Sequence, residues 1–515
     1  MNRRSRSCPL FHPLLVAALF AAAASAAAEP PAYIMPTPAE TAARLRSRDW
    51  WTLLAEEVPP LRHELGTRWP LVLWHGPGTQ PLSPAQLRLL QERGLAQPIP
   101  MDTSMIRTAQ VLQAAGAKVI MLDGRSGNWP YSLAGDSTRW ALQFEAGYTY
   151  EMAGRGALGS WHSAMPLLTE GWAVLADQIR ATLRAFRAAG VTVDGLWMDW
   201  ETDPYPFPPL FEQLRHCRLC RGMLPAEVLA DRAAWFAYCW RAYTRLYDAY
   251  LAAPALEIFP RCAVTNWHVV FSSPQHPAYY FVDDRVIPPV APGSITASNP
   301  VAYGSDLWFQ RAWRDEYPRD RRHVDQFYVH NLLRLVSADA ANRRAFAPQV
   351  RSFPWVARWC NIEAAAGDSI PDISRTAWRE VLRHLWLRDI DGMQVFNPRH
   401  PDYEQLWLEE LQDAVAVYDE MLAYGEFLDD GEAMNLDYPP PQDDGVFWSG
   451  LRLHERAVVR VTNQGDQPAA AIVPAWPQAS IRLEVPPEAG RTWRLERRPD
   501  GVHAELQAAG APVPD

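Results

Sequence analysis

The sequence predicts an α/β protein, a (β/α)8 barrel with a small C-terminal β-sandwich, on three observations. Short apolar runs typical of buried strands alternate with amphipathic helical segments from residue 70 to residue 424, and such alternation indicates a parallel sheet. After about residue 427 the pattern changes to short runs of alternating polar and apolar residues, which is typical of antiparallel strands. No glycine-rich phosphate loop follows any predicted strand, and this disfavours the alternative, a doubly wound open sheet.

Seven barrel strands can be assigned from the apolar runs. They are expected at 70–74, 117–122, from 191 onward, 262–270, 295–304, 351–359 and 392–397. An eighth strand is assumed within residues 124–165, an irregular and aromatic stretch. A loop region of that length in a compact domain favours a functional role.

Amphipathic segments predict the helices between these strands. Ser83 is the expected N-cap of a helix at 83–93, and Gly190 ends a helix at 169–189. The remaining helices are expected at 38–57, 105–115, 225–252, 321–344, 374–387 and 402–424.

The domain boundaries follow from changes in composition. Residues 1–28 have the basic start, short apolar run and small residues of a secretory signal peptide. Residues 29–427 are assigned to the barrel, and residues 428–515 to a linker and a small all-β domain. We interpret the β domain as a packing accessory in preference to a separate sugar-binding module.

The strand that begins at Val191 carries the strongest chemical signal, in the sequence VTVDGLWMDWETDP. Side chains alternate between the faces of a strand, so Trp197, Asp199 and Glu201 share a face with Val191 and Val193. The two carboxylates are expected roughly 6–7 Å apart along the strand. They lie at its C-terminal end, where parallel α/β folds carry their chemistry.

The same segment resembles the strand-four signature of chitinase-type glycoside hydrolases, D-G-x-D-x-D-W-E. The residues that match the signature are Asp194, Gly195, Asp199, Trp200 and Glu201. Trp197 stands in place of the middle Asp. Hyaluronidases also lack that Asp and keep D-W-E, so the segment is similar to their motif as well. The resemblance covers residues 194–201 only.

Two roles follow for the acids. Glycoside cleavage needs an acid that protonates the leaving oxygen and a group that stabilises the oxocarbenium-like centre. The resemblance implies that Glu201 is the general acid/base and that Asp199 orients an acetamido group of the substrate, whose oxygen is the nucleophile. The change of the middle Asp to Trp197 leaves open how Asp199 is held.

Polar and aromatic residues near the predicted strand ends are candidates for substrate contacts. Aromatic residues suit this role because the C–H faces of pyranose rings stack on them. The candidates are Trp197, Trp74, Asp123, Asn266, His268, Tyr303, Trp359, Gln394 and Asn397.

Composition and charge narrow the classes of partner. The chain has 23 Trp, 18 Tyr and 17 Phe, which fits either a large core or sugar binding. Its net charge of −10 argues against a nucleic-acid partner, which requires a basic surface. No run after the signal peptide is apolar over the length of a membrane span, so none is expected.

The cysteines of the exported chain are Cys217, Cys220, Cys239, Cys262 and Cys360, an odd number. A C-x-x-C pair in an exported protein favours a local disulfide between Cys217 and Cys220. Free thiols and a metal site remain as alternatives for this pair.

The sequence therefore predicts a secreted or periplasmic glycoside hydrolase that cleaves a polysaccharide or glycan, including one with N-acetylhexosamine, and needs no metal or organic cofactor. One alternative is a catalytically inactive barrel that binds glycans. The other is a retaining glycosidase with its own carboxylate nucleophile on another strand.

Overall fold

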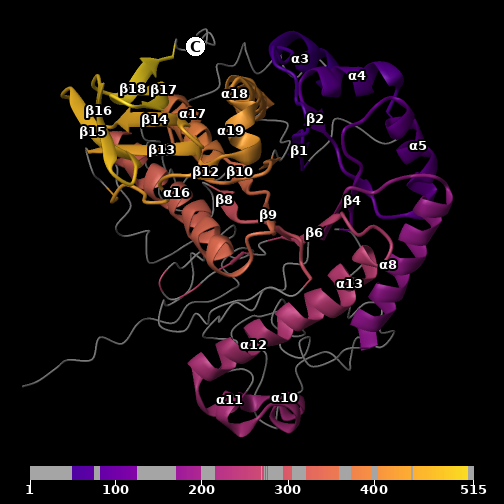
Figure 1. Ribbon diagram of the computed structural model, residues 1–515. Helices are drawn as coiled ribbons and strands as arrows, with labels where there is room; N and C mark the ends of the chain where they lie inside the picture. Colours follow the sequence, from indigo (N-terminus) through magenta and orange to yellow (C-terminus); the bar gives the residue numbers. More distant parts are fainter. Residues whose placement is uncertain are drawn as a thin grey trace, which may run out of the picture.

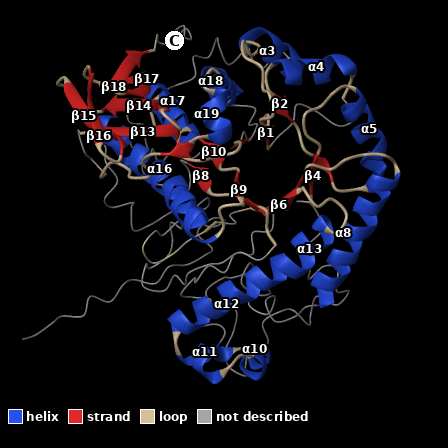
Figure 2. Cartoon of the chain, viewed as in Figure 1, coloured by secondary structure: helices blue, strands red, loops and turns tan. Residues whose placement is uncertain are grey.

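The computed structural model describes residues 49–74, 82–124, 170–198, 211, 215–267, 270–271, 273, 275, 294–303, 321–358, 373–396, 404–441 and 445–507. The predicted signal peptide lies outside them. The described chain forms an α/β barrel followed by an antiparallel β part, which lie side by side (Figure 1). Figure 2 shows the barrel strands surrounded by helices.

The described residues supply eight parallel strand positions, three of which consist of two short strands. In chain order they are β1 (Leu71–Leu73), β2 and β3 (Leu95–Ala96 and Ile99–Pro100), β4 (Met121–Asp123), β5 (Gly195–Met198), β6 (Ala263–Asn266), β7 and β8 (Ala297–Ser298 and Val301–Tyr303), β9 and β10 (Arg351–Ser352 and Trp355–Ala357) and β11 (Gln394–Val395).

Hydrogen-bonded pairing closes these strands into a ring. β1 pairs with β2, β3 to β6 pair in order, and β7 and β8 pair with β9 and β10. β11 pairs with β10 on one side and with β1 on the other. The fifth and sixth positions are joined where the Thr296 N–H donates to the Val264 carbonyl at 3.3 Å. The prediction of a (β/α)8 barrel is confirmed.

The second strand position corrects the sequence prediction. The eighth strand was expected within residues 124–165, of which residues 125–165 lie outside the described part of the chain. The ring is instead completed by β2 and β3, in the segment Leu95-Ala-Gln-Pro-Ile-Pro100. Two prolines in six residues remove backbone donors and break the strand, which is why the segment lacks the pattern of a strand.

The helices follow the predicted pattern closely. The longer ones are α3 (Trp50–Glu57), α4 (Pro84–Glu92), α5 (Ile106–Ala114), α8 (Glu170–Ala188), α12 (Arg232–Tyr247), α16 (Arg321–Phe346), α17 (Arg375–Trp386) and α18 (Glu404–Leu422). Ser83 caps α4, because its hydroxyl accepts from the Gln86 N–H while the Gln86 side chain accepts from the Ser83 N–H.

The long helix expected at 225–252 is interrupted. A short α11 (Ala226–Ala230) ends before Asp231, whose carboxylate accepts hydrogen bonds from the N–H groups of Ala233 and Ala234 and begins α12. A π-helical turn (Asp248–Ala252) then leads into α13 (Ala253–Leu256). An Asp at the N-cap explains the break, since it satisfies the backbone donors at the start of α12.

The N-terminal half of the barrel interior is filled by two aromatic rings. Trp69 and Phe353 pack with centroids 4.7 Å apart, beside Ala263 and Ala297. Gly392 makes room for Phe353, because a Cβ there would lie 2.8 Å from the ring. This end of the barrel is a packed core, as in other barrels of this kind.

The C-terminal part is a small antiparallel β-sandwich, as predicted. A five-stranded sheet has the order β12-β13-β14-β17-β18, and β15 and β16 form a second, two-stranded sheet. The strands are β12 (Glu432–Ala433), β13 (Val446–Leu453), β14 (Arg456–Asn463), β15 (Ala469–Trp476), β16 (Ala479–Val485), β17 (Ala489–Arg498) and β18 (Gly501–Leu506). Their inner faces share a core that includes Val459, Val473 and Trp493.

A buried ion-pair network attaches the sandwich to the barrel. Glu380 of α17 receives two hydrogen bonds from Arg460 of β14, Nη2 to Oε1 at 2.6 Å and Nε to Oε2 at 2.9 Å. Arg383 adds a third at 2.7 Å. Burial alone raises the pKa of Glu380, but the charges of Arg460 and Arg383 outweigh burial and hold the pKa well below its usual range.

A buried histidine continues this network. Thr462 Oγ1 donates to Glu380 Oε2 at 2.9 Å, so it accepts from His384 Nε2 at 2.8 Å. The other ring nitrogen, Nδ1, lies 2.8 Å from Ser449 Oγ and accepts from it in the neutral ring. Burial lowers the pKa of His384 well below its usual value, so this ring is neutral at pH 7.

Two structural findings concern other sequence predictions. Cys217 and Cys220 are buried and form no disulfide bond with each other, and the Cys220 N–H donates to Cys217 Sγ at 3.4 Å. The predicted disulfide between them is therefore wrong for this structure: Cys217 caps α10 (Arg218–Met223) and both side chains pack in the core.

Among the residues that the structure describes, no helix is both long enough and apolar enough to cross a membrane.

Replacing Glu380 by Gln is expected to destabilise the protein by about 3–5 kcal/mol at pH 7, since Arg460 would stay buried without its partner. The depressed pKa of Glu380 makes its contribution full above about pH 4.3 and lost as the pH falls further. Wild type should also lose stability below about pH 6.5, where the unfolded state protonates His384 first. Urea unfolding from pH 8 to pH 3 measures both effects.

The matched control is Glu484→Gln on β16, where the side chain is exposed. This variant should keep the stability and the pH profile of wild type. If Glu380→Gln is as stable as Glu484→Gln, the network does not hold the two parts together.

Candidate functional site

Three tryptophans meet inside the C-terminal half of the barrel. Trp197 comes from β5, Trp355 from β10, and Trp74 directly follows β1. The ring centroids of Trp74 and Trp197 are 5.1 Å apart, those of Trp197 and Trp355 are 5.1 Å apart, and those of Trp74 and Trp355 are 5.4 Å apart. Each pair has an edge-to-face arrangement, which aromatic rings prefer. We call these residues the indole triad.

Further aromatic rings extend the triad. Phe396, which follows β11, lies 5.3 Å from Trp74 and stacks on Tyr303 of β8 with centroids 4.6 Å apart. Trp267, which follows β6, is partly buried against the same cluster. This end of the barrel interior is therefore aromatic on most sides, which suits contact with sugar rings.

Strand alternation explains why these residues share the interior. On β5, Trp197 belongs to the interior cluster, whereas Leu196 and Met198 belong to the core under the helices. Trp197 faces inward, as predicted. Val191 and Val193, which were expected on the same face, instead pack with Leu196 and Met198 under the helices, because β5 begins only at Gly195 and the period of two does not extend back to them. Asp199 and Glu201 lie outside the described residues.

Asp123 brings a carboxylate into the aromatic interior. It ends β4, is 6% exposed, and is the register partner of Trp197 on β5. Met121, two residues earlier on β4, is part of the interior cluster, whereas Leu122 packs in the core under the helices. Asp123 therefore faces inward, at the end of the strand next to β5.

Gln394 is a second polar group in the interior. It is the register partner of both Val72 and Trp355 and is 1% exposed. Its Nε2 donates to the Phe353 carbonyl at 3.5 Å, whereas its Oε1 has no hydrogen-bond partner. The indole N–H groups of Trp197 and Trp355 also have none.

The structure brings five of the predicted substrate-contact residues together in this interior: Trp74, Asp123, Trp197, Tyr303 and Gln394. Asn266 is not among them, because its side chain turns to the helix side, where Nδ2 donates to Tyr247 Oη at 3.4 Å and to the Trp267 carbonyl at 3.0 Å. His268, Trp359 and Asn397 lie outside the described residues. The assignment of Asp199 and Glu201 as the catalytic pair stays a prediction.

Sequence reasoning missed Trp355 and Phe396. The parity of the strand predicted at 351–359 could have found Trp355, because it shares a face with Ala357 and with the chosen Trp359. Phe396 could not be recognised in this way. It is apolar, and in the sequence a phenylalanine near a strand end resembles any core residue. Both matter because they complete the aromatic interior.

Asp194, the first residue of the D-G-x-D-x-D-W-E signature, lies among the described residues. Asp194 directly precedes β5, and its Oδ2 accepts from the Ile120 N–H at 2.8 Å. Burial raises the pKa of its carboxyl group. Asp194 therefore holds the N-terminal end of β5 to the start of β4.

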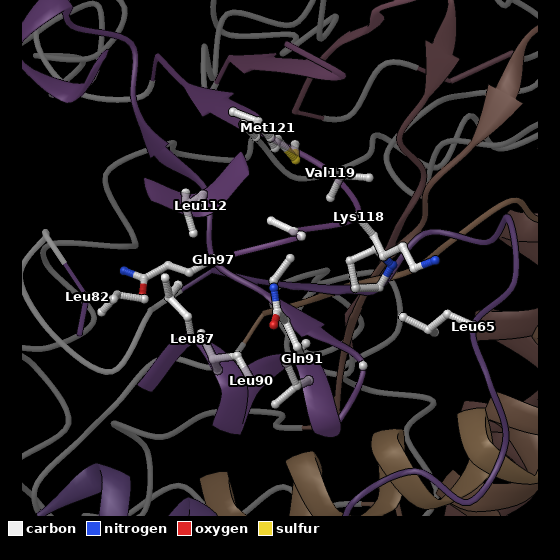
Figure 3. Close-up of a pocket in the computed structure, with 17 residues that line it drawn as sticks. Leu65, Leu82, Leu87, Leu90, Gln91, Gln97, Leu112, Lys118, Val119 and Met121 are labelled. Atoms are coloured by element: carbon white, nitrogen blue, oxygen red, sulfur yellow. The ribbon is translucent and has the colours of Figure 1, made fainter. Parts of the chain in front are cut away.

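A cavity of about 170 Å³ lies away from the indole triad. It opens between α4, α5 and the starts of β1, β2 and β4 (Figure 3). Leu87, Leu90 and Leu112 line it, with Lys118 and Leu65 on one side. The cavity therefore sits at the N-terminal ends of these strands, at the other end of the barrel from the indole triad.

Comparisons with known proteins find distant structural similarity only. No protein family and no curated protein matches the chain by sequence. A debranching enzyme from Nostoc punctiforme is similar in structure, at 12% identity and a TM-score of 0.44 over 85% of this chain and 99% of that one. An Anoxybacillus α-amylase shares 10% identity, with a TM-score of 0.40 over 75% and 78% of the two chains.

An isomaltulose synthase from a Klebsiella species is also similar, at 11% identity and a TM-score of 0.43 over 89% of this chain and all of the other. Identities and TM-scores of this size carry no argument about activity or substrate. The resemblance to chitinases and hyaluronidases rests on the motif at residues 194–201 alone.

Replacing Trp197 by Ala is expected to lower the free energy of unfolding by about 3–5 kcal/mol, because the indole packs against both other members of the triad. Trp197→Phe keeps a ring and removes an N–H that has no partner, so its loss should be less than half as large. Urea denaturation of the two variants measures the difference. Equal losses in the two variants would contradict the packing role of the ring.

Proposed function

We propose that this protein is an exported glycoside hydrolase that cleaves a polysaccharide or glycan. One observation carries the proposal: Trp197 points into the aromatic end of a closed barrel, two residues before the first acid of the Asp199-Trp200-Glu201 segment. The period-two pattern of the sequence predicts the same inward face for both acids. Sites at the C-terminal ends of barrel strands are where such folds carry their chemistry.

In this proposal Glu201 is the general acid that protonates the leaving oxygen. Asp199, which precedes it by two residues, stabilises the reacting centre. The resemblance to the D-W-E signature favours a substrate with N-acetylhexosamine, whose acetamido oxygen attacks the anomeric carbon while Asp199 orients the acetamido group. Trp197, in place of the middle Asp of the signature, gives Asp199 an apolar neighbour on the same face, where the signature has a carboxyl group.

The rest of the interior suits a sugar ligand. Trp74, Tyr303 and Phe396 offer ring faces and edges from three strand ends. Asp123 offers a buried acceptor on the strand next to β5, and carboxylates commonly accept hydrogen bonds from hydroxyl groups. Export is proposed from the signal-peptide pattern of residues 1–28. The proposed chemistry uses protein side chains and the substrate's own acetamido group, and requires no metal or organic cofactor.

A retaining glycosidase with its own nucleophile is the second candidate. The inward position of Asp123 favours it, because a carboxylate on the neighbouring strand could face Glu201 across one sugar ring. Separations of about 5–5.5 Å between the two carboxyl groups characterise such enzymes. A barrel that binds glycans without cleaving them would keep the aromatic interior but show no turnover.

Glu201→Gln should keep the fold and glycan binding and lower turnover by about 10²–10⁴-fold, the usual contribution of proton donation. Asp199→Asn should also lower turnover, and the double variant should lose little more, since both residues serve one step. Release of reducing ends under saturating substrate measures turnover. The control is Glu227→Gln, an exposed residue of α11; full activity of Glu201→Gln would exclude the acid role.

A fluorinated sugar separates the two mechanisms. A 2-deoxy-2-fluoro glycoside lacks the acetamido group and traps an enzyme carboxylate if one is the nucleophile. Our proposal predicts no covalent label by mass spectrometry, inhibition by thiazoline analogues, and an Asp123→Asn variant whose turnover stays within about tenfold of wild type. A label on Asp123 together with an inactive Asp123→Asn variant would instead identify the retaining enzyme.

A further inference from the structure

Arg388 is a fully buried cation at the place where the barrel meets the segment leading to the sandwich. It follows α17, is 0% exposed, and its Nη1 donates to Ser337 Oγ of α16. The segment that leads to the sandwich runs along α16, because the Arg344 Nη2 donates to the Ala433 carbonyl and His330 Nδ1 hydrogen-bonds the Pro439 carbonyl. Arg388 lies close enough to this segment for the charge of Asp437 to act on it.

The polar atoms of Arg388 are only partly satisfied. Both Nε and Nη2 are buried and have no hydrogen-bond partner. These two nitrogens form one edge of the planar guanidinium group, the edge that grips an anion with two parallel N–H bonds. One whole binding edge of a buried arginine is therefore without an acceptor.

Three other buried arginines of the described chain have several hydrogen-bond acceptors each. Arg93 donates to the carbonyls of Leu54, Val58, Leu89 and Ala55 at the end of α3 and in α4. Arg343 binds Asp339 and two carbonyls, and Arg460 binds Glu380 on two atoms. Arg388 differs from all three, since a single hydroxyl oxygen is its hydrogen-bond acceptor.

The charge of Arg388 also needs compensation. Burial lowers its pKa to about 9, and the charge of Asp437 opposes this effect, so the guanidinium group is still a cation at pH 7. Asp437 is exposed and forms no hydrogen bond with Arg388. An unpaired buried charge costs several kcal/mol, which a bound counter-ion removes.

We propose that the Nε–Nη2 edge of Arg388 binds a small monovalent anion, with chloride as the physiological ligand. The site is separate from the indole triad and independent of the proposed activity. Bound chloride accepts both N–H bonds and neutralises the guanidinium group. It should therefore stabilise the contact between α16, α17 and the segment that leads to the sandwich.

The test compares full-length proteins in sodium chloride and in sodium gluconate of equal ionic strength. Gluconate is too large for a buried guanidinium edge. Wild type should unfold at a temperature about 2–4 °C higher in 300 mM chloride than in gluconate, and Arg388→Met should show no difference between the salts. The control is Arg482→Met, which removes an exposed arginine of β16 and should keep the full chloride effect.

Two measurements on wild type keep the test decisive if Arg388→Met does not fold. The ³⁵Cl linewidth should exceed that of free chloride and return to it on addition of excess bromide, and bromide-grown crystals should show an anomalous peak beside Arg388. Equal unfolding temperatures in the two salts, with no bromide at Arg388, would overturn the proposal. A chloride effect that appears only in Asp437→Asn would also overturn it, because Asp437 would then be the counter-ion.

Discussion

The mutual packing of Trp74, Trp197 and Trp355 is the interaction on which the functional end of the molecule depends. These residues come from the first, fourth and seventh strand positions, so their contacts cross the barrel and do not merely join neighbours. They form a rigid aromatic floor, because large rings in edge-to-face contact leave little room for movement. Asp123, Tyr303 and Phe396 are positioned around this floor, and the proposed acids follow Trp197 in the sequence.

One end of the barrel and the attached sandwich contribute stability, whereas the other end carries the proposed chemistry. Trp69 and Phe353 fill the N-terminal end of the barrel. The Asp194 carboxylate there accepts a hydrogen bond from the Ile120 N–H and so joins β5 to β4. The sandwich is attached beside the barrel through Glu380, Arg460 and His384, away from the indole triad. Stability and the proposed chemistry thus use different charged residues, which allows each to be tested without disturbing the other.

Much of the fold could be predicted from the sequence because hydrophobic periodicity is local. The apolar runs at strands and the 3.6-residue period of α8 and α17 each report on one element. The second strand position could not be found this way, since its prolines erase the pattern of a strand. The break before α12 was equally hidden, because a single Asp231 at an N-cap resembles any polar residue on a helix surface.

The site was predictable where it depends on strand parity and not where it depends on contacts between distant segments. Parity predicted the inward face of Trp197, and it could have given Trp355. Parity also separates Asn266 from Thr265, since Asn266 pairs with the outward Met198 and Thr265 with the inward Trp197, but no local pattern identifies Tyr247 as the partner of Asn266. The partners of buried charges such as Glu380 and Arg388 are likewise fixed by the packing of α17 against other elements, which no local pattern encodes.

The most direct test of the proposed activity is a reducing-end assay of the wild-type protein on a panel of defined polysaccharides, with and without N-acetylhexosamine. Our account predicts that at least one polymer with N-acetylhexosamine releases reducing ends in proportion to enzyme and time. Binding to such polymers with no release from any member of the panel would contradict it, and would identify the barrel as a glycan-binding protein.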